Sequence, residues 1–295
     1  MKKVLKTLLI LSLAVLFAMS LVACGDKGGN KSADGGIKYK KIDGVYTIYK
    51  YVAEEGKSVI NLGEELGDDV TDVRIKKGAF KGNDTLKKII VSNKITQIDK
   101  GAFEGMKSLE SLEVCFIGKT ANADVYPNQS QAQVDKAVDS ERTIAHFFGD
   151  TDYSVGVPVK ISYNSSSSTT CYMPITLKEI VVNTQDEYSI PMYAFNGAVN
   201  LTSIKLIGNI TAIGEYAFGG CKELKAIELP SSVNTIYDGA FINCAKLATL
   251  TVDANASLIV KKDAFVGTKI NRNALDGNIS GIDENMRDEI FGKAE

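Results

Sequence analysis

Apolar residues recur in this chain with a period of 23 residues. Between Ile210 and Val252 one pattern occurs twice: an isoleucine or valine, an isoleucine three residues later, then Ala-Phe, a cysteine, and the apolar frame Leu-x-x-Ile/Leu-x-Leu/Val. Phe218 and Phe241 are equivalent in the two copies, as are Cys221 and Cys244. A frame that repeats at this interval predicts one short strand per unit, paired with the equivalent strand of the next unit.

The phenylalanine of this pattern marks six turns of the chain. Four further Ala-Phe dipeptides continue the series, so that the full set is Phe80, Phe103, Phe195, Phe218, Phe241 and Phe265. One unit cannot bury its apolar face alone, and stacked units therefore share a continuous core. We predict that the six rings form this repeat core. An exposed aromatic stripe that binds a ligand is the alternative, although packing alone already requires an in-line ring in each unit.

The order of motifs within one unit is specific. Ile-x-x-Ile-Gly precedes Ala-Phe-x-x-Cys-x-x-Leu, and this arrangement resembles the BspA-like family of leucine-rich-repeat proteins over residues 70–115 and 177–268. The resemblance implies a β-rich, right-handed leucine-rich-repeat solenoid with short parallel strands and short helical or 3-10 turns. It also implies adhesion to host matrix proteins or to neighbouring cells. The departures keep every apolar anchor: Asp99 and Tyr237 stand where Gly214 does, and Asn83, Met106, Ala198 and Thr268 replace the cysteine.

Residues 1–23 are predicted to be a lipoprotein signal peptide. Three lysines precede an apolar run that ends in Leu21-Val22-Ala23-Cys24, and a short apolar segment after basic residues is typical of secretory signals. The closing residues resemble the lipobox of bacterial lipoproteins, which implies cleavage before Cys24 and attachment of diacylglycerol to its sulfur. An uncleaved membrane-spanning anchor is the alternative. Either reading places residues 25–295 on the extracytoplasmic face of the cell membrane.

Three segments outside the repeats are predicted to tether or cap the solenoid, whose repeats occupy residues 70–268. Residues 24–36 hold the lipidated cysteine and a flexible glycine-rich tether. Residues 37–69 form an N-terminal cap, in which alternating apolar and polar residues flank Asp43-Gly44 as in a β-hairpin. Residues 269–295 form a C-terminal cap with a short helix within Gly281–Glu295.

One large insertion, residues 115–174, interrupts the repeats, because the frame that ends at Val114 is regained only at Leu177. We expect a short amphipathic helix within residues 129–148, a strand within 151–163 and a loop tip without packing at 164–170. Insertions in repeat arrays often lie on the binding face. The candidate partner-binding side chains are therefore Tyr126, His146, Phe147, Phe148, Tyr153 and Tyr163. A bulge that only restores the register of the repeats is the alternative.

The residues that carry chemistry do not form a recognisable catalytic motif. His146 is the single histidine, and a triad with Cys115 or Cys171 is formally possible, but no nucleophile motif surrounds any of them. Spacings typical of zinc, calcium or nucleotide sites are missing as well. We predict that the protein is not an enzyme and has no catalytic residues, metal site or cofactor.

The remaining cysteines leave two alternatives open. Cys221 and Cys244 are equivalent in adjacent units and within the range of a disulfide, but other units place Asn, Met or Ala there. This variation favours two buried thiols that pack as small apolar side chains. Cys115 and Cys171 flank the insertion, and a disulfide between them would close its base.

Charge narrows the choice of partner. With a formal net charge of −2, the chain lacks the basic surface that nucleic-acid binding requires. The solvent-facing strand positions mix both signs of charge, and we expect lateral pairs such as Lys205 with Glu228.

These observations predict a monomeric, non-catalytic cell-surface lipoprotein that binds a protein or glycan ligand through its ectodomain. The alternative is a cell-envelope scaffold that recognises peptidoglycan or a partner envelope protein. An enzyme built around His146 is the third possibility and the least supported. The step from fold to adhesion is an analogy, because one fold hosts many functions.

Overall fold

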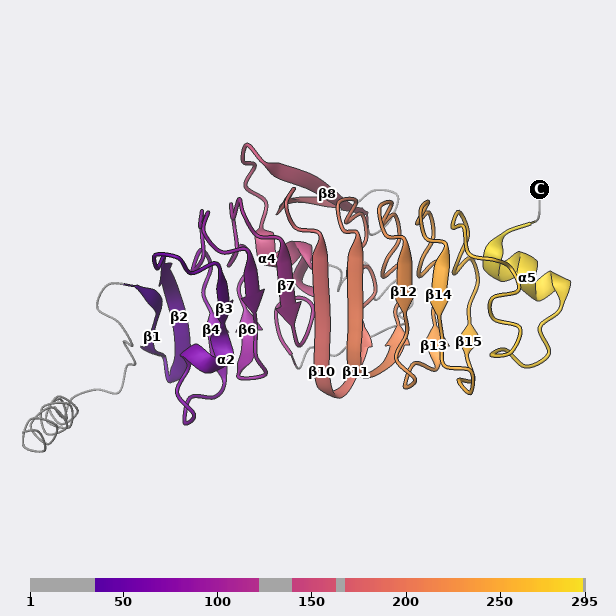
Figure 1. Cartoon of the computed structure of the whole chain (residues 1–295), viewed down its shortest axis with the longest axis horizontal. Helices are drawn as coiled ribbons and strands as arrows, with labels where there is room; N and C mark the ends of the chain where they lie inside the picture. Colours follow the sequence, from indigo (N-terminus) through magenta and orange to yellow (C-terminus); the bar gives the residue numbers. More distant parts are fainter. Residues whose placement is uncertain (1–34, 122–139, 163–167, 294–295) are drawn as a thin grey trace, which may run out of the picture.

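The computed structural model describes residues 35–121, 140–162 and 168–293. Within these ranges the chain winds into a solenoid of mostly parallel β-strands, whose successive turns lie side by side along the long axis of the molecule (Figure 1). The N-terminal strands and the C-terminal helix lie at opposite ends. The predicted β-rich solenoid is confirmed.

Two sheets run along the solenoid, and smaller strand pairs complete it. The seven-stranded sheet contains, in chain order, β3 (Val59–Asn61), β5 (Lys88–Ile90), β7 (Ser111–Val114), β10 (Glu179–Ile190), β11 (Ser203–Ile213), β13 (Thr235–Ile236) and β15 (Ile259–Val260). The four-stranded sheet contains β1 (Gly36–Ile42), β2 (Val45–Val52), β4 (Val73–Ile75) and β6 (Ile95–Ile98). Two further pairs are β12 (Ala226–Glu228) with β14 (Thr249–Thr251), and β8 (Gly156–Ser162) with β9 (Ser168–Pro174).

Equivalent repeat positions pair across neighbouring strands. Lys88 is in register with Ser111, 23 residues later in the chain, and Ala226 with Thr249 at the same interval. Ser111 is also in register with Glu179, so the seven-stranded sheet passes over the insertion without gaining a strand from it. The periodicity of the sequence therefore predicts the strand register correctly.

The phenylalanines of the repeats stack along the axis of the solenoid. The rings of Phe195, Phe218 and Phe241 follow one another at centroid distances of 5.1 and 5.0 Å and are nearly parallel. Backbone bonds run between the same turns, as from the Phe218 N–H to the Ala240 carbonyl (2.8 Å). Phe80, Phe103 and Phe265 are equally buried. Each ring packs on the next unit, which is how a unit that cannot fold alone gains its core.

The N-terminal end is closed by an antiparallel hairpin of β1 and β2. Asp43 and Gly44 both adopt a left-handed backbone at its turn, with φ of 52° and 84°, as a two-residue hairpin turn requires. β2 then pairs in parallel with β4, and the Tyr51 ring stacks on Phe80 at 5.5 Å. A one-turn helix, α2 (Leu62–Glu65), precedes the first repeat. The hairpin predicted from the sequence is confirmed.

The C-terminal end is closed by α5 (Glu284–Phe291). The Asp283 side chain accepts a hydrogen bond from the Met286 N–H and so caps the first turn of this helix. Phe291 stacks on Phe265 at 5.3 Å, and the Phe265 N–H donates to the Ile290 carbonyl. The helix predicted within residues 281–295 is confirmed, and its last aromatic ring continues the stack of the repeats.

Part of the insertion belongs to the solenoid core. The described helical pieces are a 3-10 turn, η1 (Ser140–Arg142), and α4 (Ala145–Phe148); residues 129–139 of the predicted helix lie outside the described residues. The Phe103 N–H donates to the Phe147 carbonyl (2.9 Å), just as the Phe80 N–H donates to the Ala102 carbonyl one turn earlier (2.9 Å). Residues 145–148 therefore take the place of an Ala-Phe turn between Phe103 and Phe195.

The rest of the described insertion forms the hairpin of β8 and β9, which lies along one edge of the solenoid beside the turns (Figure 1). β8 falls within the predicted strand at 151–163. β9 begins at Ser168, so the prediction of a loop through Thr170 is wrong at its C-terminal end. Antiparallel pairing with β8 draws these polar residues into a strand, because Lys160 is in register with Thr170.

The four described cysteines are free thiols. Cys221 and Cys244 are fully buried, and their sulfurs donate to the carbonyls of Phe195 (3.2 Å) and Phe218 (3.0 Å). The hydrogen bond with the neighbouring Cys244 thiol, together with burial, raises the pKa of Cys221 well above its ordinary value. Cys115 and Cys171 are not joined either.

A candidate ligand groove

Along the paired strands of the seven-stranded sheet, exposed side chains of neighbouring strands form ion pairs and hydrogen bonds with one another. Lys88 lies 3.6 Å from Glu113, which also accepts a hydrogen bond from Asn183 (3.0 Å). On the next strands, Glu179 accepts from Ser111 (3.0 Å) and lies 2.6 Å from the Lys205 ammonium. The hydrogen bond from Lys205 lowers the pKa of Glu179 from its ordinary value. These charges already have partners within the protein.

The predicted pair between Lys205 and Glu228 does not form, because Lys205 pairs with Glu179 instead. β10 and β11 are joined in one parallel ladder, which brings Glu179 close to Lys205. β11 and β12 belong to different sheets and are not paired. The ladder of strands on this face is therefore broken between β11 and β12, although equivalent residues remain 23 positions apart across the break.

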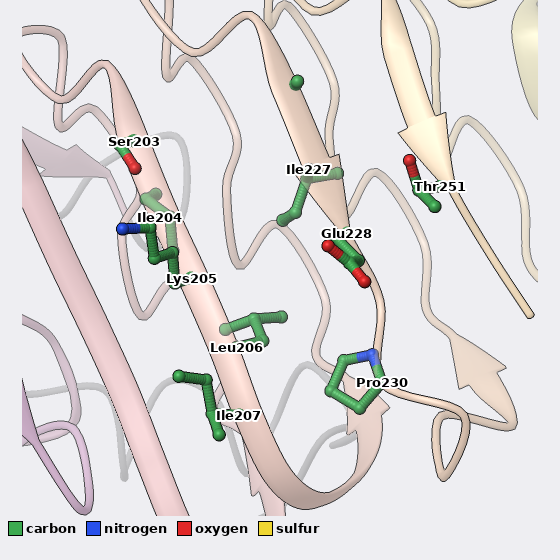
Figure 2. A pocket seen from close by; sticks show the side chains of 10 residues that line it. Ser203, Ile204, Lys205, Leu206, Ile207, Ile227, Glu228, Pro230 and Thr251 are labelled. Atoms are coloured by element: carbon green, nitrogen blue, oxygen red, sulfur yellow. The ribbon is translucent and has the colours of Figure 1, made fainter.

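A groove of about 460 Å³ opens at this break. Figure 2 shows Ser203 to Ile207 along β11, with Ile227, Glu228 and Pro230 across the groove and Thr251 on the next strand. The full lining is Ser203, Ile204, Lys205, Leu206, Ile207, Ala226, Ile227, Glu228, Pro230 and Thr251. Its floor is aliphatic, because Ile204, Leu206 and Ile227 are buried.

Two side chains that line the groove, Ile207 and Glu228, are exposed to solvent, unlike the buried floor. Ile207 leaves 46% of its surface exposed, whereas the other strongly exposed aliphatic side chains of this sheet, Val59 and Ile259, lie on its two end strands, β3 and β15. Glu228 is exposed, and no described residue forms an ion pair with it. Around them stand the small side chains of Ser203, Ala226 and Thr251. The groove therefore offers an apolar contact, a negative charge and space for a ligand.

The side chains predicted to bind a partner are placed differently. His146, Phe147 and Phe148 lie in the solenoid core, where the His146 Nε2 is 3.0 Å from the Ile98 carbonyl oxygen and both rings contact Phe103. A buried side chain cannot contact a partner on the folded surface, so for these three the expectation is wrong. Tyr153 is half-buried beside Gly156, and Tyr126 and Tyr163 lie outside the described residues.

The described cysteines are poorly suited to act as nucleophiles with this histidine. Burial raises the pKa of Cys115 to about 11 and that of Cys171 to about 12, and the reactive form of cysteine is the thiolate. Both thiols are therefore protonated near neutral pH. In the described ranges, no three His, Cys, Asp or Glu side chains gather closely enough to hold a metal ion.

Sequence reasoning placed several groove residues on the solvent face but did not single them out. One signal was available, since Ala226, Thr249 and Thr251 are small where earlier units carry Lys88 and Glu113 at the equivalent positions. The break itself leaves no trace in the sequence, because the period of 23 residues continues across it.

Among the described helices, none has the length and apolar composition to cross a membrane.

Three solved structures of leucine-rich repeat proteins are similar to parts of this chain. A crystal structure of a leucine-rich repeat protein from T. pallidum is 16% identical with a TM-score of 0.35, over 80% of this chain and 88% of that one. One from Bacteroides ovatus is 18% identical with a TM-score of 0.33, over 82% and 58% of the two chains. A leucine rich cell surface protein from Faecalibacterium prausnitzii is 15% identical with a TM-score of 0.24, over 94% and 100%.

The search of curated protein sequences finds no match. The family model described as the BspA type leucine-rich repeat region matches six copies, over residues 69–131 and 165–289, which is more than half of the chain. The same stretches contain the Ala-Phe turns and the strand frame from which the solenoid is built. The chain belongs to the BspA-type leucine-rich repeat family.

Proposed function

We propose that this protein is a cell-surface lipoprotein that binds a macromolecular ligand, a host matrix protein or a component of a neighbouring cell, through its leucine-rich-repeat ectodomain. The observation that carries the proposal is the groove between β11 and β12. Elsewhere on these strands the charged side chains form ion pairs with one another, whereas Ile207 and Glu228 remain available to a ligand. The proposed contact site is therefore this groove and not the insertion, where the sequence analysis had placed the candidate partner-binding side chains.

Binding of the purified full chain to an array of matrix proteins, peptidoglycan and glycans tests this function. Ala226→Tyr places a bulky uncharged side chain in the groove, and the matched variant Ala245→Tyr places one at an exposed position outside it. We expect Ala226→Tyr to weaken binding to a matrix protein at least about tenfold, or ~1.4 kcal/mol, and Ala245→Tyr to leave it unchanged.

The other outcomes of these binding experiments test whether the groove is the contact site and distinguish adhesion from a scaffold role. If the two variants bind as tightly as the natural chain, the groove is not the contact site. Groove-dependent binding to peptidoglycan alone would overturn adhesion and support a cell-envelope scaffold. Circular dichroism of both variants checks that the solenoid is intact, so that a loss of binding reports the surface and not the fold.

We propose further that the ectodomain is held at the cell surface by diacylglycerol on Cys24. The support is the Leu-Val-Ala-Cys sequence after an apolar segment; residue 24 lies outside the described residues. In a bacterial host that processes lipoproteins, we expect the natural chain in the membrane fraction with the mass of the lipid on the Cys24 peptide. We expect Cys24→Ser to lose the lipid and Cys115→Ser to keep it. Membrane retention of unmodified Cys24→Ser would indicate an uncleaved anchor instead.

A further inference from the structure

The hairpin of β1 and β2 carries a local charge opposite in sign to that of the whole chain. Its four basic residues are Lys38, Lys40, Lys41 and Lys50. Asp43 is the single acidic residue within 36–52, whereas the formal net charge of the whole chain is −2. Among the described residues, none forms an ion pair with Lys40, Lys41 or Lys50. The hairpin therefore offers positive charge that the protein itself does not neutralise.

Three of these lysines project from the same, exposed face of the hairpin. Lys38 and Lys50 are in register across the two strands, and side chains in register lie on one face. Lys40 follows Lys38 by two strand positions and so projects to the same side. The opposite face packs on the first repeat, and its buried side chains are Ile37, Tyr39, Ile48 and Tyr51.

Two further side chains of this face are apolar or aromatic. The Lys40 ammonium lies over the Tyr49 ring, 5.5 Å from its centroid. Val45 is in register with Ile42, which follows Lys40 by two positions. Tyr49 and Val45 leave 38% and 37% of their surfaces exposed. Lysines beside an exposed tyrosine and an aliphatic side chain are typical of surfaces that lie in the headgroup region of a bilayer. We call Lys38, Lys40, Val45, Tyr49 and Lys50 the basic hairpin face.

The position of the hairpin in the chain brings this face close to a membrane. β1 and β2 lie at one end of the solenoid, opposite α5 (Figure 1). Cys24, the predicted lipidation site, precedes the first residue of β1, Gly36, by 12 positions. A glycine-rich segment of this length has a root-mean-square reach of about 20 Å. A lipid on Cys24 therefore confines the hairpin to a thin layer above the phospholipid headgroups, where even a weak attraction is effective.

We infer that the basic hairpin face docks on the anionic phospholipid headgroups of the membrane that holds the lipid anchor. Lys40 and Lys50 contact the headgroup phosphates, and Tyr49 and Val45 lie among the headgroups. Charge complementarity and the short distance to Cys24 select this partner. Docking holds the N-terminal end of the solenoid against the membrane. The inference rests on the proposed function, since it uses the lipid anchor at Cys24.

Tryptophan fluorescence of the full, lipidated chain in vesicles tests the inference. The chain contains no tryptophan, so Tyr49→Trp introduces a single probe into the basic hairpin face. The vesicles consist of phosphatidylcholine, with or without about 30% phosphatidylglycerol as the anionic lipid, and contain a lipid with a nitroxide quencher on its headgroup. We expect quenching at least about twofold stronger in the anionic vesicles, and loss of this difference in about 1 M salt, which screens the attraction. The matched probe Ile259→Trp, at an exposed position on β15, should be quenched little in either.

Lysine variants of the Tyr49→Trp chain assign the contact. Lys40→Gln combined with Lys50→Gln is expected to lower the ratio of docked to free hairpin about twentyfold in anionic vesicles, because each lysine near an anionic surface contributes about fivefold. Lys225→Gln combined with Lys261→Gln removes the same charge from exposed positions in the C-terminal repeats and should leave the quenching unchanged. Circular dichroism checks that both double variants are folded.

The inference is overturned if Tyr49→Trp is quenched equally in neutral and anionic vesicles, if the double variant at Lys40 and Lys50 is quenched as before, or if Ile259→Trp is quenched as strongly. Tryptophan emission that changes with protein concentration and not with anionic lipid would assign this face to a contact between two copies of the chain. Failure of the anchor is measured separately, by the mass of the Cys24 peptide. A peptide without lipid rejects the anchor, and quenching at millimolar anionic lipid still decides whether the face docks.

Discussion

Replacing Phe218 by alanine is expected to lower the free energy of unfolding by about 3–5 kcal/mol. The Phe218 ring is fully buried and lies between Phe195 at 5.1 Å and Phe241 at 5.0 Å. The substitution leaves a cavity in the middle of the stack and removes contacts with both neighbouring turns, on which a solenoid unit depends. Urea unfolding followed by circular dichroism measures the loss.

Phe291→Ala is the matched control for this substitution. The Phe291 ring is partly exposed and stacks on a single neighbour of the repeat spine, Phe265 at 5.3 Å. We expect a smaller loss there, because solvent reaches the end of the stack and can relax the cavity. Equal losses at both positions would contradict the view that stability comes from contacts between successive turns.

Gly208→Ala is expected to lower the free energy of unfolding by about 2–5 kcal/mol, the sum of a left-handed backbone penalty and a steric clash. Gly208 has a φ of 94°, and a Cβ atom added there would lie 1.7 Å from the Thr184 carbonyl oxygen of the neighbouring strand. β11 must therefore move away from β10 to accept the methyl group. Thermal and urea unfolding, compared with the natural chain, measure the effect.

Gly44→Ala separates the two contributions to this loss. Gly44 also adopts a left-handed backbone, with a φ of 84°, but a Cβ atom there would meet nothing within 4 Å. We expect a loss of about 1–2 kcal/mol, from the backbone alone. Gly208→Ala should also weaken ligand binding, because Ile207 precedes it in the groove. Equal destabilisation by the two substitutions would show that the close approach of β10 and β11 is not important for stability.

The features that repeat or that depend on neighbouring residues could be predicted from the sequence. The interval of 23 residues sets which positions pair, as between Lys88 and Ser111, because every unit must bury the same apolar face. The Asp43-Gly44 turn of the first hairpin depends on two residues that tolerate a left-handed backbone. The terminal helix was expected within residues 281–295, and the structure places it at Glu284–Phe291 with Asp283 as its cap.

The role of the insertion could not be predicted in the same way. Residues 145–148 follow no repeat interval, and His146, Phe147 and Phe148 look like exposed candidates when they are read along the chain. Their place in the core depends on the gap that the solenoid leaves between Phe103 and Phe195, and on backbone bonds to residues more than 40 positions away in the chain. A side chain becomes buried because another segment covers it, and local sequence does not show which segment does so.

The sequence by itself determined the solenoid, its strand register, its aromatic core and its two caps, because each follows from a repeated apolar frame or from a turn and cap chemistry of a few residues. The tertiary structure alone decided where a ligand can be held. β11 pairs with β10 and not with β12, the Lys205 ammonium lies next to Glu179, and Ile207 and Glu228 remain exposed across the break. The repeat interval is identical on both sides of that break, so the opening depends on how strands pack and not on any residue that the repeat specifies.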